Sequence, residues 1–245
     1  LLDAGKKVIL QFTATWSGPD FAYHNSGVLG DLYADFGPDG TDELRVFLIE
    51  SDDSNSLDDL YGTGSATQGD YVTGTAYPII DNGGSIFATY DGAYYPTIYT
   101  VCPNRILTQS GQIDVAAHAS IFQDANCAEA SNANDAYLVD YTGETVTCGG
   151  SPVSISVRLM NNGLEALTAC TITAYDGATP LGSVDWTGSL ATYELEEVEV
   201  TSASLTSSTS ITIEVTSGDD NSNNNSVSAE VIAASPTPSP VVWRS

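Results

Sequence analysis

The chain has 245 residues, with 32 acidic and 6 basic side chains, so its formal net charge at pH 7 is -26. Nucleic acids and anionic lipid surfaces are therefore excluded as partners, because binding either requires clusters of Lys and Arg. We also expect no membrane insertion, since no apolar run approaches the roughly 20 residues that span a bilayer. A hydrophobic fraction of 42% excludes a disordered acidic chain, and the length suits two domains of ordinary size.

The first half of the sequence alternates strand and helix patterns. Short continuous apolar runs predict buried strands, and periodic apolar positions before Gly37-Pro38 predict a helix. In chain order, the predicted elements are strand 7–12, helix 17–36, strand 44–49, strand 96–101, strand 105–109 and helix 113–128. An insert at 62–94, rich in Gly, Thr, Tyr and Asp, separates the second and third strands. We expect any binding specificity to lie in this long insert.

The predicted first helix begins within Trp16-Ser17-Gly18-Pro19-Asp20-Phe21. Ser is a preferred N-cap, Pro fits the first turn, and Asp three residues after Ser approximates a capping box. The catalytic alternative makes Ser17 a nucleophile with Asp20 and His24 nearby, but such a serine needs its base within hydrogen-bond reach. Asp20 and His24 could also share a metal, although two ligands are too few. We favour the structural interpretation and expect no enzymatic activity.

The first half of the chain resembles thioredoxin-like domains found in secreted multidomain proteins of Gram-negative bacteria. The resemblance rests on residues 7–21, on the turn at 36–43, and on Tyr95-Pro96-Thr97 followed by Cys102-Pro103-Asn104. It implies a thioredoxin-like fold with a cis peptide bond before Pro96.

The same resemblance implies a degenerate redox site. Ser17 and Asp20 stand where thioredoxin-like enzymes carry two cysteines, and disulfide exchange requires a thiolate. The redox-dead site would consist of Ser17, Asp20 and Pro96. A surface that docks extended peptides would survive the loss of the thiols, and its candidate binding residues are Trp16, Tyr94, Tyr95 and Thr97.

After Asn134 the sequence changes to short alternating runs separated by turn residues. Seven such runs with Asn-Gly, Asp-Gly and Gly-Asp turns predict an immunoglobulin-like β-sandwich. The runs are 136–142, 152–160, 169–175, 180–187, 191–201, 209–217 and 226–233. Their pattern resembles that of adhesion-type bacterial Ig-like domains.

The predicted fold class is therefore a multidomain chain, α/β followed by all-β. Residues 1–133 form the thioredoxin-like domain, and residues 134–234 form the Ig-like sandwich. The Pro-rich tail at 235–245 is a linker or a strand donated to a neighbouring subunit.

The four cysteines show no CxxC or Cys/His spacing that suggests zinc. Their even number predicts two disulfides, for which three connectivities are possible. We favour Cys102–Cys127 and Cys148–Cys170, one in each domain. If the last two strands of the first domain are antiparallel, the closing helix brings Cys127 back towards Cys102.

Three acidic loops are candidate calcium sites: 39–43, Asp52-Asp53 and Asp219-Asp220-Asn221. Calcium takes about six to eight oxygen ligands, and none of these loops matches the EF-hand pattern. Asp and Asn also favour turns without any ion. We expect no cofactor, with calcium as the alternative.

These observations predict a secreted, redox-inactive structural or adhesive subunit, located outside the cell or on its surface, in an extracellular filament or surface layer. Its partners would be further copies of itself or other surface proteins. Val241, Val242 and Trp243, at the apolar end of the tail, are candidate assembly residues. The alternative is an extracellular module that binds peptides or glycans through the cis-Pro groove and the 62–94 insert.

Overall fold

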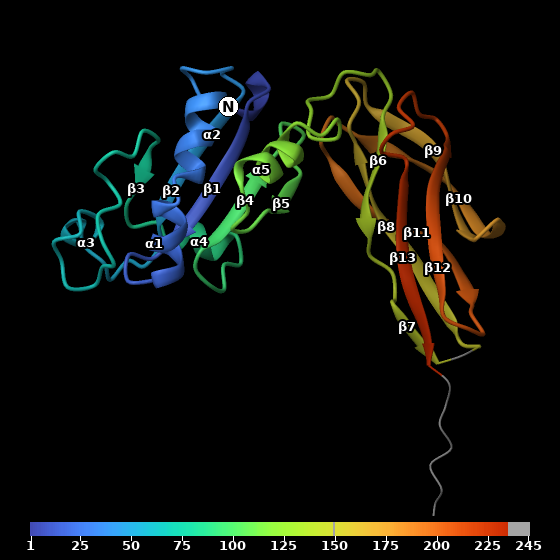
Figure 1. The fold of residues 1–245 in the computed structure, drawn as a ribbon. Coiled ribbons are helices and arrows are strands. Elements are labelled where there is room, and N and C mark those ends of the chain that lie inside the picture. Colours follow the sequence, from blue (N-terminus) through green and yellow to red (C-terminus); the bar gives the residue numbers. More distant parts are fainter. Residues whose placement is uncertain (149, 235–245) are drawn as a thin grey trace, which may run out of the picture. The chain divides into compact units, whose positions relative to one another are not determined.

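The computed structural model describes residues 1–148 and 150–234 and separates two compact units, Leu1–Glu129 and Ala130–Ser245 (Figure 1). The boundary falls a few residues before the predicted one. The candidate assembly residues Val241, Val242 and Trp243 lie outside the described residues. No helix in the described ranges combines the length and apolarity needed to cross a membrane.

Unit 1 is built on a five-stranded mixed sheet with strand order β3-β2-β1-β4-β5. Strands β1, β2 and β3 run parallel, and β4 is antiparallel to both β1 and β5. The predicted sequence of strand, helix, strand, insert, strand, strand and helix is observed. The elements are η1 (Leu2–Ala4), β1 (Lys7–Thr13), α1 (Gly18–Asn25), α2 (Val28–Phe36), β2 (Leu44–Glu50), α3 (Leu57–Leu60), β3 (Ile79–Ile80), α4 (Gly84–Thr89), β4 (Thr97–Val101), β5 (Leu107–Gln109) and α5 (Val115–Phe122).

The predicted helix at 17–36 is two helices, α1 and α2. Gly27 separates them with a φ of +79°, a left-handed conformation that only glycine adopts without strain. The helical conformation is interrupted there, so α1 ends at Asn25 and α2 begins at Val28. The prediction of one continuous helix was wrong because the apolar pattern runs through the break.

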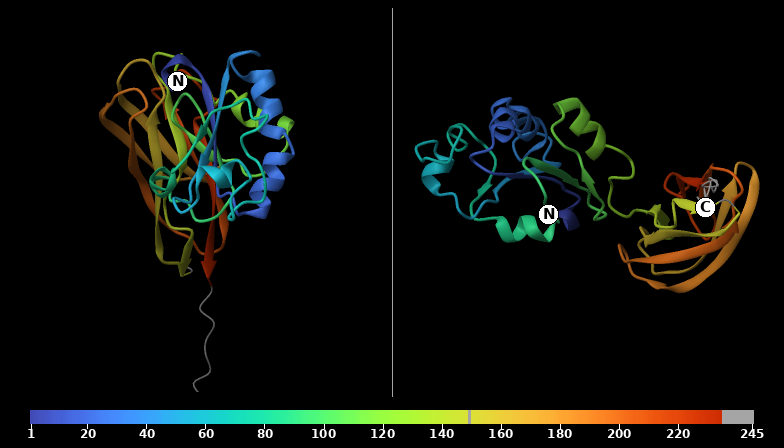
Figure 2. Two further views of the ribbon diagram at one scale, coloured as in Figure 1. Left: turned by 90° about the vertical axis from the view of Figure 1, so that its left-hand side faces the viewer. Right: turned by 90° about the horizontal axis from the view of Figure 1, so that it is seen from below.

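Helices cover both faces of the sheet of unit 1 (Figure 2). Alternate residues of β1 and β2 point to opposite faces. On one face Ile9 and Leu48 pack with Leu32 of α2 and Phe122 of α5. On the other face Phe12, Ile49 and Phe87 of α4 form a second cluster. Apolar burial on both faces explains why β1 and β2 are nearly continuous apolar runs.

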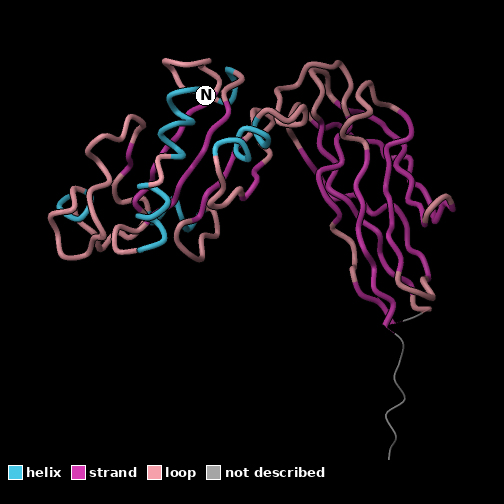
Figure 3. The backbone as a smooth tube through the Cα atoms, viewed as in Figure 1, coloured by secondary structure: helices cyan, strands magenta, loops and turns pink. Residues whose placement is uncertain are grey.

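The 62–94 insert contains β3 and α4, and its first part is loop (Figure 3). This loop is anchored to unit 1 by aromatic side chains. Tyr71 is fully buried and Tyr77 nearly so, and both belong to the core cluster beneath α2. The insert is therefore part of the packed core of unit 1.

Unit 2 is a sandwich of two antiparallel sheets, with one short parallel pairing between β13 and β7. One sheet has the order β10-β9-β12-β13-β7, and the other has the order β11-β8-β6. The core between the sheets is rich in Val, Ile and Leu. The strands are β6 (Ala136–Tyr141), β7 (Val146–Cys148), β8 (Pro152–Asn161), β9 (Leu167–Asp176), β10 (Thr179–Leu190), β11 (Leu195–Ser204), β12 (Thr209–Ser217) and β13 (Ser226–Ala234). All seven predicted strands are present, and β7 was missed.

Of the two predicted disulfides, Cys102–Cys127 forms and Cys148–Cys170 does not. Cys148 ends β7 and pairs with Ala234 at the end of β13. The register of β13, β12 and β9 places that end of the sheet beyond Asp176, six residues along β9 from Cys170. Six strand residues span about 20 Å, whereas a disulfide requires Cα atoms about 4–7 Å apart. The second pairing was wrong because it depends on strand register.

Candidate functional site

The motif Ser17-Gly18-Pro19-Asp20 forms the first turn of α1, as the structural interpretation predicts. Ser17 is the N-cap, and its Oγ accepts a hydrogen bond from the backbone N–H of Asp20 at 3.5 Å. Both side chains are buried, Ser17 at 5% exposure and Asp20 at 0%. The Tyr95-Pro96 peptide bond is cis, as the resemblance implies.

The carboxyl group of Asp20 faces the protein interior. Neither of its oxygens accepts a hydrogen bond from any described residue. Burial raises the pKa of Asp20 from 3.8 to about 6, and the neighbouring hydroxyl groups of Ser17 and Thr13 oppose only part of this rise. Buried carboxyl groups without partners are rare in folded proteins, so this position is chemically unusual.

A layer of buried polar residues lies at the carboxyl ends of β1 and β2. Gln11 and Thr13 share the face of Ile9, and Thr13 pairs with Glu50 across the two strands. Side-chain atoms of Gln11, Thr13, Glu50 and Tyr71 lack partners in the described chain. Burial raises the pKa of Glu50 to about 7, although Asn55 donates to its Oε1 at 2.6 Å.

Sequence reasoning missed Glu50 and Tyr71 in this layer. Glu50 follows the apolar run of β2 directly, and a carboxylate at the end of a buried strand is the signal that could have identified it. The sequence around Tyr71 gives no sign of its burial, because Tyr71 lies in a loop whose apolar residues follow no periodic pattern. Its phenol is fully buried, and burial raises its pKa far above the ordinary value.

Neither histidine belongs to a catalytic arrangement with Ser17. The imidazole of His24 lies 3.4 Å from the hydroxyl of Tyr77 and 3.5 Å from that of Thr75. Burial lowers its pKa. His118, for which the sequence suggests no partner, lies 2.8 Å from the hydroxyl of Tyr23, and burial lowers its pKa to about 4. Both imidazoles therefore serve packing contacts away from the Ser17 hydroxyl.

The predicted binding residues Trp16, Tyr94, Tyr95 and Thr97 do come together. Trp16 is 48% exposed and packs edge-on against Tyr95, with ring centroids 6.0 Å apart. The indole N–H donates to Asp52 at 2.7 Å, which fixes the ring. Tyr94 is 59% exposed, and its carbonyl accepts a hydrogen bond from Thr97 at 2.6 Å. Two exposed aromatic side chains therefore flank the cis-proline.

The backbone of Tyr95 is unpaired beside these aromatic rings. Within the described residues, its N–H and carbonyl take part in no hydrogen bond, whereas strand pairing begins two residues later at Thr97. The Tyr95 side chain is held by a hydrogen bond to the carbonyl of Ser51 at 3.1 Å and by stacking on Phe87. The site therefore offers a rigid residue with a free donor and a free acceptor.

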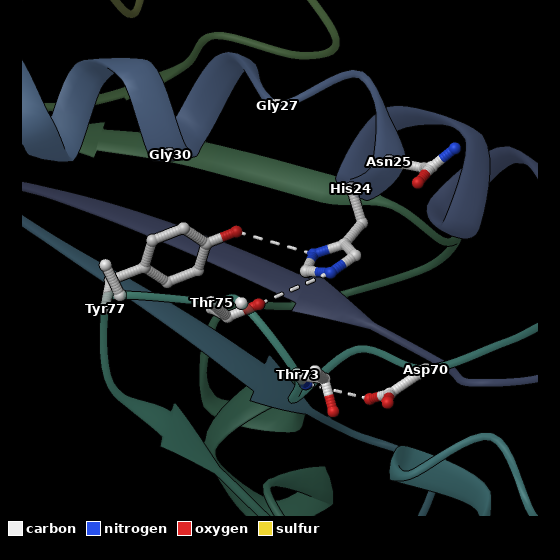
Figure 4. Close-up of a pocket in the computed structure, with 10 residues that line it drawn as sticks. His24, Asn25, Gly27, Gly30, Asp70, Thr73, Thr75 and Tyr77 are labelled. Atoms are coloured by element: carbon white, nitrogen blue, oxygen red, sulfur yellow. Dashed lines mark hydrogen bonds between the residues drawn. The ribbon is translucent and has the colours of Figure 1, made fainter.

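A polar cavity of about 330 Å³ lies between the α1–α2 junction and the insert (Figure 4). Figure 4 shows His24 pointing towards Tyr77 and Thr75, with Asp70 and Thr73 across the cavity. The carboxylate of Asp70 accepts hydrogen bonds from the backbone N–H groups of Val72 and Thr73. Both bonds end on Oδ1 of Asp70, on the side of the cavity opposite the imidazole of His24.

In two of the three candidate calcium loops, carboxylate groups accept hydrogen bonds from other residues of the protein. Asp42 accepts hydrogen bonds from Lys6 and Arg45 at 2.8 and 2.6 Å. Asp52 accepts from Trp16, and Asp53 from the backbone N–H of Gly84. Among the described residues, no three His, Cys, Asp or Glu side chains gather as around a metal ion.

No family model matches the chain, and no curated protein does. Among solved structures, the CARDB domain of the PF1109 protein from Pyrococcus furiosus has 20% identity and a TM-score of 0.35, covering 42% of this chain and 96% of that one. A domain of a Methanosarcina acetivorans cell surface protein has 18% identity and a TM-score of 0.34, covering 41% and 92%. Tryparedoxin II from C. fasciculata has 21% identity and a TM-score of 0.32, covering 47% and 75%. The CARDB likeness lies in the second half of the chain.

Proposed function

We propose that the chain is an extracellular, redox-inactive binding module, in which a thioredoxin-like unit 1 docks an extended polypeptide and an Ig-like unit 2 serves as a structural partner domain. The observation that carries this proposal is the unpaired backbone of Tyr95 between exposed Trp16 and Tyr94. An extended peptide can add to such a segment as a strand, while aromatic neighbours contact its side chains.

The absence of catalysis is part of the same proposal. Ser17 and Asp20 supply no thiolate, and Ser17 has no histidine within hydrogen-bond reach in the described chain. The buried carboxyl group of Asp20 is closed off from solvent. The residues at the former redox positions therefore begin a helix, and the chemistry available at the surface is that of binding.

The test is selection of extended peptides from a displayed library by the full chain. We expect enriched peptides to bind Trp16→Ala at least thirtyfold more weakly, the effect of losing an interface residue worth about 2 kcal/mol. Leu164→Ala is the control, because Leu164 is also an exposed apolar side chain but belongs to unit 2. N-methylation of the peptide at the residue opposite Tyr95 should also abolish binding. Peptides that bind the wild type and Trp16→Ala equally would contradict the proposal.

A second candidate, self-assembly into a filament or layer, is favoured by an exposed apolar pair at one end of unit 2. Val146 of β7 and Ile232 of β13 are partners in register, with exposures of 61% and 52%. Exposed apolar side chains that lie side by side can form a contact surface with another protein. Electron microscopy of the full chain and of a chain ending at residue 234 tests this. Polymers that need the tail support assembly by strand donation, and a monomer at high concentration contradicts it.

A further inference from the structure

The loop that follows β2 lies against the docking site, the exposed surface around Trp16 and Tyr95. The indole N–H of Trp16 donates a hydrogen bond to Oδ2 of Asp52 at 2.7 Å. The hydroxyl of Tyr95 donates to the carbonyl of Ser51 at 3.1 Å. Asp53 is the next residue of the same loop, and it is exposed. The loop therefore brings two carboxylates, those of Asp52 and Asp53, to the docking site.

The hydrogen-bond donors to these two carboxylates in the described chain are neutral. Asp52 accepts from the indole of Trp16 and from the backbone N–H and hydroxyl of Ser54. The hydrogen bonds from Ser54 and Trp16 lower the pKa of Asp52, so this carboxyl group is ionised at neutral pH. Oδ1 of Asp53 accepts from the backbone N–H of Gly84 at 2.9 Å. Neutral donors orient a carboxylate without cancelling its charge.

This negative charge acts on the aromatic side chain at the centre of the docking site. Burial raises the pKa of Tyr95 to about 12, and the charges of four nearby carboxylates, Asp52 and Asp53 among them, add to the rise. A negative potential at the Tyr95 hydroxyl opposes its ionisation, and the same potential attracts a cation.

The basic side chains of the described residues are paired with carboxylates outside the docking site. Two of these pairs belong to the same carboxylate, that of Asp42. Asp52 and Asp53 take part in none of the pairs. The pairs are Lys6–Asp42, Lys7–Glu43, Arg45–Asp42, Arg105–Asp3 and Arg158–Asp140. The charge at the docking site is thus available to a binding partner.

We propose that the docking site selects basic segments, with an arginine side chain of the bound polypeptide lying against Trp16 and pairing with Asp53. This inference rests on the proposed docking function and adds the class of partner. A guanidinium group is attracted by the π electrons of an indole ring, and its planar N–H groups match the two oxygens of a carboxylate. Oδ2 of Asp53 accepts no hydrogen bond in the described chain, so it is open to such a donor. Acidic segments would be repelled at the same position.

The overall charge of the chain is the competing explanation for any preference for basic peptides. A formal net charge of -26 attracts cations to the whole surface. At an ionic strength of about 0.15 M, however, exposed charges more than about 8 Å apart are largely screened from one another. Under these conditions a local pair with Asp53 and a general attraction predict different effects for single substitutions.

The experiment is selection of extended peptides from a displayed library by the full chain, after depletion of the library on Trp16→Ala. The two chains have the same net charge, so depletion removes peptides that bind acidic surface in general. We expect the enriched peptides to contain arginine. The most enriched peptide is then synthesised in two forms, with arginine and with its neutral analogue citrulline, and titrated at about 0.15 M ionic strength.

The citrulline form should bind the wild type about tenfold more weakly, because it loses both the ion pair and the attraction to the indole. Asp53→Asn should weaken the arginine form about fivefold, near the upper end for an exposed pair, and leave the citrulline form unchanged. The side-chain oxygen of Asn at this position can still accept the hydrogen bond from Gly84.

Asp185→Asn is the matched control, because it removes the same charge from an exposed position on β10 of unit 2. It should leave binding of the arginine form almost unchanged. Enriched peptides without arginine, or equal effects of Asp53→Asn and Asp185→Asn, would overturn the inference, while loss of binding by Trp16→Ala would still support docking. A selection that yields no peptide dependent on Trp16 would contradict docking itself, and the basic specificity with it.

Discussion

Two helix starts in unit 1 share the pattern Ser-x-x-Asp but use it differently. At α3, Ser56 and Asp59 form a complete capping box. Asp59 accepts hydrogen bonds from the backbone N–H and the hydroxyl of Ser56, at 2.9 and 2.7 Å. At α1, only the half of the box made by the Ser17 hydroxyl is present, and the carboxyl group of Asp20 has no partner in the described chain.

The backbone before each helix explains the difference. The N–H of Ser17 already donates to the carbonyl of Ala14, so Asp20 cannot close the box. Its side chain turns towards the sheet, where burial raises its pKa, while the hydrogen bonds from Ser56 and Ala66 lower the pKa of Asp59. The same four-residue pattern therefore gives a hydrogen-bonded carboxylate at one site and a buried acid without a hydrogen-bond partner at the other. Sequence spacing alone does not separate them.

The largest expected change is the conversion of the α1 start into a redox site. Ser17→Cys combined with Asp20→Cys should give a chain that catalyses insulin reduction in the presence of a dithiol, because the first turn of α1 then carries two thiols separated by Gly18 and Pro19. Each single variant and the wild type should remain at the uncatalysed rate. Reduction of insulin by the wild-type chain would contradict a redox-inactive site.

Asp20→Asn should stabilise the protein at pH 8 by on the order of 3 kcal/mol, because it removes a buried charge with no partner. The folded state holds a proton on Asp20 up to about pH 6, whereas the unfolded chain releases it near pH 3.8. This carboxyl group therefore lowers the free energy of unfolding as the pH rises between these values, and Glu50 acts in the same direction up to about pH 7.

Urea denaturation at pH 4, 5, 6 and 8 measures this effect, and Asp124→Asn, an exposed change in the same unit, is the control. Asp20→Asn should flatten the fall in stability between pH 4 and 6. His118 has the opposite sign, since its lowered pKa removes stability as the pH falls below about 6.5. An Asp20→Asn chain that is less stable than the wild type at pH 8 is the result that would rule out the buried-acid assignment.

Ser56→Ala should cost about 1 kcal/mol of stability, the typical value for loss of an N-cap side chain. The hydroxyl of Ser56 both accepts from the N–H of Asp59 and donates to its carboxylate, so its loss removes these two hydrogen bonds, while the backbone N–H of Ser56 can still donate to Asp59. Thermal unfolding compared with Ser54→Ala, an exposed neighbour outside the box, gives the net effect. A loss no greater than that of the control would show that the cap at α3 contributes nothing.

Ser17→Ala should have the smallest effect, about 0.5 kcal/mol, at the lower end of the range for caps. The Ser17 hydroxyl makes one long hydrogen bond to the helix, and the helix start also has Pro19 in its first turn. Urea titration of Ser17→Ala and Ser56→Ala under the same conditions gives the loss in free energy of unfolding for each variant, and the ratio of the two losses compares the caps. A larger loss at Ser17 than at Ser56 would reverse the comparison.

Much of the fold was predictable because the strands of both units are marked by local patterns. The apolar runs at β1 and β2 and the alternation in unit 2 identified the strands to within a few residues. The break at Gly27 was missed because it depends on one positive φ angle. The Cys148–Cys170 pairing was wrong because it depends on register across three neighbouring strands.

The residues of the candidate site also fall into two groups, those predictable from local motifs and those that depend on tertiary packing. Trp16, Tyr95 and Pro96 were identified because their motifs are short and local, and the structure brings them together. The unpaired state of Asp20 was not predictable, because it follows from a hydrogen bond of Ser17 to Ala14 and from burial in the folded chain. Glu50 and Tyr71 reach the same polar layer only through tertiary packing.

The most direct measurement is a carboxyl-carbon NMR titration that follows Asp20 and Asp59 in one sample of the full chain. We expect a midpoint near pH 6 for Asp20 and one below the ordinary 3.8 for Asp59. Two midpoints that coincide near pH 4 would contradict a buried, unpaired acid at the start of α1.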